Sequence, residues 1–224
     1  MVPPNLKFIV DDVEDTWHYG EKFDLIHSRM MVGSIKDWPV FLSRCWDQMR
    51  PGGWIELQDV LTLTSDDGTF CLDPPSCPLA RWWASAVLAF EVMGRSMVAA
   101  KDHKSRLETA GFVDVREMVF KWPLNTWPRD KRYKELGLWS SENTHDALEA
   151  IAMAPLTRAL KWEVEEVQVL LAGARKNIRD TRIHAYWDMW VQSFRRTYFN
   201  LSILEINGHP LTNLTSRVVY ARKP

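Results

Sequence analysis

The sequence predicts an α/β fold that is half of a doubly wound parallel sheet, and three short apolar runs carry this prediction. Residues 6–10, 23–26 and 54–57 each have the composition of a buried strand, and polar residues follow each run. Between the second and third runs, residues 35–50 place apolar side chains at helical spacing, which supplies the crossover that parallel strands need. The carboxyl ends of parallel strands share one edge, so we expect a binding site there.

The elements after the first strand follow from local signals. Pro51-Gly52-Gly53 ends the helix at 35–50 and turns the chain into the third strand. The next elements are expected in this order: a loop at 61–77, an apolar helix at 78–97, a short helix at 101–110 with Gly111 after its end, and an edge strand at 112–123.

The second half of the chain is expected to be mostly helical. Helices are expected to open at 127–130, to span 143–154 before Pro155, and to span 163–179, which has the clearest apolar stripe. A last strand is expected to begin at 182–187 and to resume at 217–224. Residues 188–216 between them show no period and are interpreted as an atypical insertion, either translated intron or a long surface loop.

We therefore expect one domain over residues 1–224. Its sheet half comprises 1–77 and 101–123, and its helical lobe comprises 78–100 and 128–180.

Composition excludes several classes of function. The net charge is −1, so no basic field favours nucleic acid or an anionic membrane as a partner. The three cysteines are odd in number, so they cannot all form disulfides, and their spacing is not that of metal ligands. We therefore expect no metal site, and we expect an intracellular location, cytoplasmic or nuclear. The amino terminus shows no signal peptide, and no apolar run is long enough for a membrane helix.

Polar residues at the strand ends suggest cofactor chemistry, with alternatives. Asp12 directly follows the first run, where a carboxylate can accept hydrogen bonds from an adenine amine or a ribose hydroxyl, and Trp17 is placed to cover a purine. Asp12 alone is equally compatible with a cap of the next helix or a solvated strand end. His27 at the second strand is either a chemical group or a residue hydrogen-bonded to backbone.

In combination and in order, these segments resemble the later motifs of class I S-adenosylmethionine-dependent methyltransferases. The motifs that carry the resemblance are Asp11-Asp12-Val13-Glu14-Asp15-Thr16-Trp17, Phe23-Asp24-Leu25-Ile26-His27-Ser28-Arg29 and Arg50-Pro51-Gly52-Gly53-Trp54-Ile55-Glu56. A narrower set resembles the fungal LaeA-like methyltransferases, which act in or regulate secondary-metabolite gene clusters: His27-Ser28-Arg29-Met30, 33–38, 51–58 and Arg182-Ile183-His184-Ala185-Tyr186-Trp187.

The resemblance implies S-adenosylmethionine as cofactor and a role for each matching residue. Asp12 would contact the adenine amine and Val13 the ring edge, with Trp17 as a lid. His27 and Arg29 would line the methionine end of the cofactor.

On the acceptor side, Glu56, Gln58 and Asp59 would face the substrate, and the helical lobe would cover the pocket. Methyl transfer is a direct displacement onto O, N or C of a small-molecule acceptor, in which alignment supplies most of the rate. A base is needed only for a protonated acceptor, and His27 and Glu56 are the catalytic candidates.

The chain departs from the family pattern at its start. It opens at what would be the third strand, which implies an incomplete Rossmann-like methyltransferase sheet whose first two strands are absent, and none of its ten glycines forms a Gly-x-Gly-x-Gly loop. Because that loop orients the cofactor, we expect weakened or lost cofactor binding.

Two functions are therefore compatible with the sequence. One is a methyltransferase of fungal secondary metabolism; the other is a non-catalytic, methyltransferase-like regulator or truncated remnant that acts by contact with a protein partner. A nicotinamide dehydrogenase also needs a glycine fingerprint and explains Pro51-Gly52-Gly53-Trp54 less well.

Overall fold

A four-stranded mixed sheet forms the centre of the described chain. The structure, a computed structural model, describes residues 5–73 and 75–195. The strands lie in the order β1-β2-β4-β3, with bounds Phe23–Arg29 for β1, Met49–Thr64 for β2, Val113–Pro123 for β3 and Tyr186–Arg195 for β4. β1 is parallel to β2, and β4 lies antiparallel between β2 and β3. The predicted α/β class is confirmed, as is the partial sheet.

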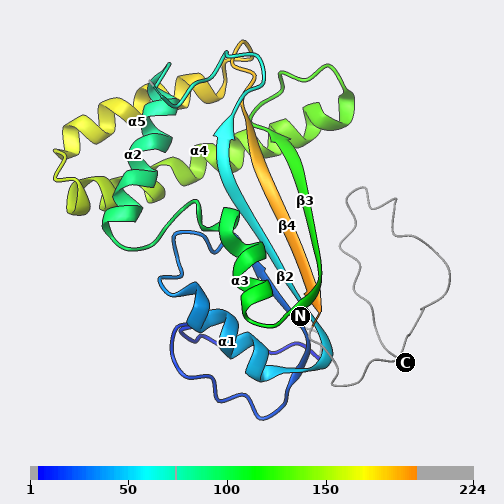
Figure 1. Ribbon diagram of the computed structural model, residues 1–224. Helices are drawn as coiled ribbons and strands as arrows, with labels where there is room; N and C mark the ends of the chain where they lie inside the picture. The colour runs from blue at the N-terminus through cyan, green and yellow to red at the C-terminus, as the bar shows by residue number, and fades with distance from the viewer. Residues whose placement is uncertain (1–4, 74, 196–224) are drawn as a thin grey trace.

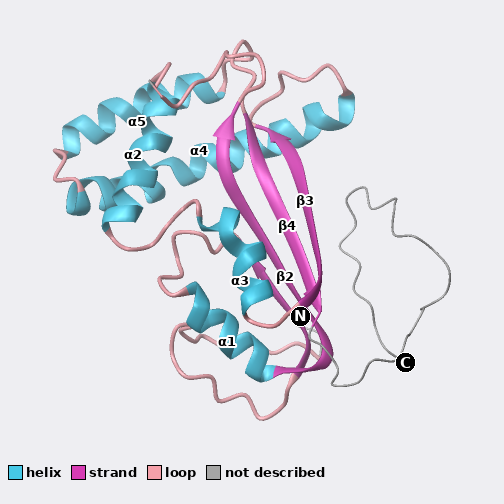
Figure 2. Cartoon of the chain, in the orientation of Figure 1, coloured by secondary structure: helices cyan, strands magenta, loops and turns pink. Residues whose placement is uncertain are grey.

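The helices divide into two groups (Figures 1 and 2). Their bounds are Trp38–Gln48 for α1, Pro78–Val92 for α2, Ala99–Asp102 for the 3₁₀ turn η1, His103–Thr109 for α3, Lys131–Ala159 for α4 and Val164–Ile178 for α5. α1 and α3 lie at one end of the sheet, where α1 contacts β2 and α3 contacts β3 and β4, whereas α2, α4 and α5 pack together as a lobe at the other end. Gly111 takes a φ of 92° just after α3, as its place after a helix end predicts.

The first predicted strand does not form. Residues 6–10 lie outside any strand, and Phe8 and Val10 are fully or almost fully exposed. In the described chain β1 pairs with β2, and the run at 6–10 joins no ladder. An apolar run becomes a strand only where a neighbour takes its backbone hydrogen bonds and a second layer covers its side chains.

Two further predictions about element boundaries were wrong. The helix expected to open at 127–130 and the helix expected at 143–154 are one continuous helix, α4, which runs past Pro155 because a buried stripe that includes Leu148, Ala152 and Leu156 packs across the proline. Residues 188–195 belong to β4 and not to an insertion, because they pair with both β2 and β3. The remainder of the predicted insertion and the segment 217–224 lie outside the described residues.

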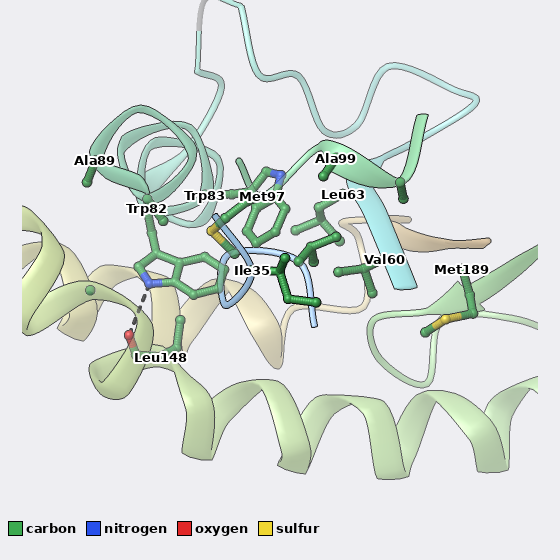
Figure 3. Close-up of a cluster of buried hydrophobic side chains, with 14 of the residues drawn as sticks. Ile35, Val60, Leu63, Trp82, Trp83, Ala89, Met97, Ala99, Leu148 and Met189 are labelled. Carbon is green, nitrogen blue, oxygen red and sulfur yellow. Dashed lines mark hydrogen bonds between the residues drawn. The ribbon is translucent and has the colours of Figure 1, made fainter. Parts of the chain in front are cut away.

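Tryptophan side chains link the lobe internally and to the sheet. Trp82 and Trp83 on α2 are buried, and the indole N–H of Trp82 donates to the Leu148 carbonyl of α4 at 3.1 Å (Figure 3). Trp83 packs edge-on against Trp187 of β4, with ring centroids 4.8 Å apart. The core therefore continues from the sheet into the lobe.

Gly137 on α4 provides a test of this packing. A Cβ at this position would collide with the backbone carbonyl of Asn125, which cannot move as a side chain can. Alanine is the better helix former by about 1 kcal/mol, yet overpacking costs about 1–3 kcal/mol, so Gly137→Ala is expected to destabilise. Urea unfolding measures the change, and Gly20→Ala, whose Cβ would meet nothing within 4 Å, is the matched control. A Gly137→Ala protein more stable than the parent would contradict this packing.

Candidate functional site

The alternation of side chains along β1, β2 and β4 sorts the candidate residues onto two faces of the sheet. We call the face that carries Ser28, Leu57, Asp59 and Gln192 the core face; these side chains are buried. The opposite face carries His27, Arg29, Glu56, Gln58 and Ser193, and we call it the His27 face. Because successive residues of a strand point to opposite sides, neighbours in sequence separate here.

His27 and Glu56, the two catalytic candidates, meet on the His27 face. They are register partners in the parallel β1–β2 pair, and His27 Nδ1 lies 3.0 Å from Glu56 Oε1. An ionised carboxylate only accepts hydrogen bonds, so Nδ1 carries the proton and donates. The side chains are 40% and 34% exposed, which leaves the pair accessible to a small molecule. His27 thus has a side-chain partner, not the backbone partner of the alternative interpretation.

Asp59 does not lie with this pair. It was expected to face the substrate beside Glu56, but it is 1% exposed and points into the core face. Strand alternation explains the difference, since Glu56 and Asp59 are an odd number of residues apart. Asp59 instead accepts the backbone N–H groups of Met31 and Val32 at 2.6 and 3.1 Å, and the Nε2 of buried His103 lies 3.4 Å from its other oxygen.

The Asp59 carboxylate holds the turn that follows β1. Met30 adopts a φ of 56°, which is unfavourable for a residue other than glycine. Its backbone N–H donates to the Gln58 carbonyl at 2.9 Å, and the next two amides bind Asp59. These bonds fix the direction in which the chain leaves β1, immediately after His27 and Arg29.

The predicted adenine-binding residues form a second group, beside α1. Asp12 is exposed, and its carboxylate accepts the N–H of Glu14 at 2.8 Å. The indole N–H of Trp17 donates to the Val13 carbonyl at 3.0 Å, and its ring packs edge-on against Phe41 of α1. These contacts place Asp12 in a local turn and match neither alternative, because residues 13–15 form no helix and the run before Asp12 forms no strand.

Two hollows lie in the described part of the chain. A hollow of about 300 Å³ lies between α1 and α3, and one of about 840 Å³ lies between the starts of α2 and α5. Neither is lined by any of the residues that the sequence assigned to the cofactor: Asp12, Val13, Trp17, His27 and Arg29. Arg29 instead places its guanidinium 5.9 Å from the centre of the Trp122 ring. The assignment of these five residues to the cofactor therefore remains a prediction.

The motif at 182–187 connects β4 to the loop after β2. Tyr186 donates its hydroxyl to Asp66 at 2.5 Å, and His184 Nδ1 lies 2.5 Å from Asp67. Hydrogen bonds from Thr69, then from His184, lower the pKa of Asp67 to about 2. Lys121 also donates to Asp66, and this bond contributes most to raising the pKa of Lys121 to about 12. The motif therefore fixes a loop at the lobe end of the sheet.

Residues 5–73 and 75–195 contain neither a metal-binding cluster nor a membrane-spanning helix. Across these ranges, no three His, Cys, Asp or Glu side chains gather closely enough to hold a metal ion. None of the helices in the same ranges has the length and apolar character that a bilayer crossing requires.

Sequence reasoning missed Ser193 as a partner of Glu56 and His103 as a partner of Asp59. Ser193 donates to Glu56 Oε2 at 3.3 Å, but it lies in the segment for which the sequence predicted no strand. Extending β4 through residue 195 would have placed Ser193 opposite Glu56. The pairing of His103 with Asp59 has no such signal, since it depends on how α3 packs on the sheet.

Comparison with known proteins agrees with the motifs. A family model described as "Methyltransferase domain" matches residues 2–117. The methyltransferase pytC of Aspergillus terreus is 39% identical over 88% of this chain and 60% of its own length. The secondary metabolism regulator LAE1 of Cochliobolus heterostrophus is 36% identical over 87% of this chain and 64% of its own length.

A solved structure is also similar. The Haemonchus contortus phosphoethanolamine N-methyltransferase 2, in complex with phosphomonomethylethanolamine and S-adenosylhomocysteine, gives a TM-score of 0.43 at 16% identity, over 84% of this chain and 37% of its own. This chain spans about 60% of the length of the curated relative pytC. By the family match, the chain belongs to the methyltransferase domain family.

Proposed function

We propose that this chain takes part in S-adenosylmethionine-dependent methyl transfer to a small-molecule acceptor in fungal secondary metabolism. The single observation that carries the chemical part is the His27–Glu56 pair, accessible on one face of the sheet. When bound, S-adenosylmethionine would supply the methyl group on its sulfonium. An aligned nucleophile bonds to the methyl carbon as the carbon–sulfur bond breaks, and S-adenosylhomocysteine leaves without the need for a metal.

His27 is the base in this proposal. Glu56 holds the Nδ1–H of the imidazole, so the lone pair of Nε2 remains for the proton of an acceptor hydroxyl or amine. As Nε2 takes that proton, the Glu56 carboxylate 3.0 Å from Nδ1 stabilises the imidazolium. A carboxylate–imidazole pair can act as a base for an acceptor that must lose a proton. It gives no such help to an acceptor that has no proton to lose.

Replacing His27 tests this role. His27→Ala is expected to lower kcat by about 10²- to 10⁴-fold for an acceptor that carries an O–H or N–H group, because general base catalysis is worth that much. Formation of S-adenosylhomocysteine measures the rate, and Glu56→Gln is expected to lower it less. His145→Ala is the matched control, since His145 is also paired with a carboxylate but lies on α4. A His27→Ala protein with the kcat of the parent would remove His27 from the chemistry.

The second candidate is a regulator that acts through contact with a protein partner. It is supported by the separation of the predicted cofactor residues into two groups and by the relative LAE1, which is named a secondary metabolism regulator. Calorimetry with S-adenosylmethionine separates the candidates. Micromolar binding supports the enzyme, and no heat at millimolar cofactor supports the regulator.

We also propose an intracellular location, cytoplasmic or nuclear. Cys45, Cys71 and Cys77 are all unpaired, which suits a reducing compartment. Fluorescence of a tagged chain in a fungal cell tests this, and recovery from the culture medium would contradict it.

A further inference from the structure

The His27–Glu56 pair is part of a longer row that crosses the sheet. His27 of β1 is opposite Glu56 of β2, and Glu56 is opposite Ser193 of β4. The three side chains lie on the same face and are joined by two hydrogen bonds, at 3.0 Å between His27 and Glu56 and at 3.3 Å between Ser193 and Glu56. We propose that Ser193 is a positioning residue, which holds the Glu56 carboxylate in the orientation that keeps the proton of His27 on Nδ1.

The two carboxylate oxygens of Glu56 have different hydrogen-bond donors, and this supports the positioning role. Oε1 accepts from His27 Nδ1, and Oε2 accepts from the Ser193 hydroxyl. Rotation about the last bond of a glutamate side chain is soft, so one hydrogen bond alone leaves the carboxylate plane poorly defined. Bonds on both sides set that plane along the row of register partners. Ser193 does not contact the imidazole, so it acts through Glu56.

The order of the three residues separates this arrangement from a hydrolytic triad. In a hydrolytic triad the imidazole lies between the serine and the carboxylate and activates the hydroxyl. Here the carboxylate lies in the middle, and the serine hydroxyl donates to it. The serine is therefore not a nucleophile. The imidazole nitrogen that Glu56 does not engage is His27 Nε2, because Nδ1 is hydrogen-bonded to Glu56.

Ser193 is on a strand that the core holds firmly. The adjacent Gln192 points to the core face, is buried, and donates to the Ala100 carbonyl at 3.2 Å and to Glu117 at 2.8 Å. β4 is hydrogen-bonded on both sides, to β2 and to β3. The hydroxyl therefore approaches Glu56 from a fixed backbone, which is what a positioning role requires.

Nitrogen-15 NMR of the imidazole in the full chain tests the proposal without donor or acceptor. At a pH where His27 is neutral, the parent is expected to show mainly the Nδ1–H tautomer, because the partner of one ring nitrogen decides which carries the proton. Ser193→Ala is expected to raise the ratio of Nε2–H to Nδ1–H by roughly threefold to tenfold, the range for one lost hydrogen bond. Ser193→Thr keeps the hydroxyl and is expected to restore the parent ratio. Ser43→Ala, an exposed serine on α1, is the control.

Two results would overturn the proposal: a Ser193→Ala tautomer ratio equal to that of the parent, or a parent imidazole that does not favour Nδ1–H. The role of Ser193 as a support for catalysis rests on the proposed function, but the NMR readout does not. If the tautomer responds to Ser193 while His27→Ala methylates at the parent rate, the base role fails and the Ser193–Glu56–His27 row stands.

Discussion

Asp59→Ala is expected to lower the free energy of unfolding by about 3–5 kcal/mol, because three hydrogen-bond donors lose their acceptor. Asp59 and His103 are 1% and 0% exposed. The variant leaves the N–H groups of Met31 and Val32 without their acceptor, together with the Nε2 of His103. Each buried polar group left unsatisfied costs about 1–3 kcal/mol. The Nδ1 atom of His103 has no hydrogen-bond partner among the described residues, so the imidazole depends on Asp59 for its hydrogen bonding.

Urea unfolding followed by far-UV circular dichroism measures the change. Asp59→Asn is a graded control, since its amide oxygen can still accept from the backbone of the turn, and it is expected to lose less stability. Asp146→Ala is the surface control, because Asp146 is exposed and pairs with His145 on α4. A loss below about 1 kcal/mol for Asp59→Ala would mean that the turn after β1 does not depend on this carboxylate.

Trp82→Ala is expected to lower the free energy of unfolding by a similar amount, about 3–5 kcal/mol, as large core aromatics do on truncation. The Trp82 side chain is 0% exposed and packs against Trp83, and its indole N–H reaches the Leu148 carbonyl (Figure 3). Truncation removes the contacts that the Trp82 side chain makes between α2 and α4, and it leaves a cavity in the lobe. The rest of the lobe cannot close it without moving a long helix.

Trp139 offers the matched control for this truncation. It is a tryptophan on α4 with 68% of its surface exposed, so Trp139→Ala is expected to change stability by less than about 0.5 kcal/mol. Denaturant unfolding monitored by circular dichroism compares the two variants, because tryptophan fluorescence would change with the substitution itself. Equal effects at Trp82 and Trp139 would contradict the packing of α2 on α4.

Local patterns predicted most helices and strands well. The apolar stripe at 163–179 became α5 and the alternation at 112–123 became the edge strand β3, whereas α1 ends at Gln48 and Pro51-Gly52-Gly53 lies within β2. Each signal depends on residues close together in sequence, such as the capping box of Glu163 and Glu166. The strand expected at 6–10 failed because a buried strand needs partners that lie outside the run itself.

The sequence by itself determined the α/β class, the order of β1, α1 and β2, and the family that the motifs resemble. It also named His27 and Glu56 as base candidates at neighbouring strand ends, and the structure joins them by a hydrogen bond. Only the tertiary structure decided that Asp59 is a buried anchor and that Ser193 joins the pair. The physical reason is that these roles depend on strand register and on which face a helix covers, and both are set by contacts between residues far apart in the chain.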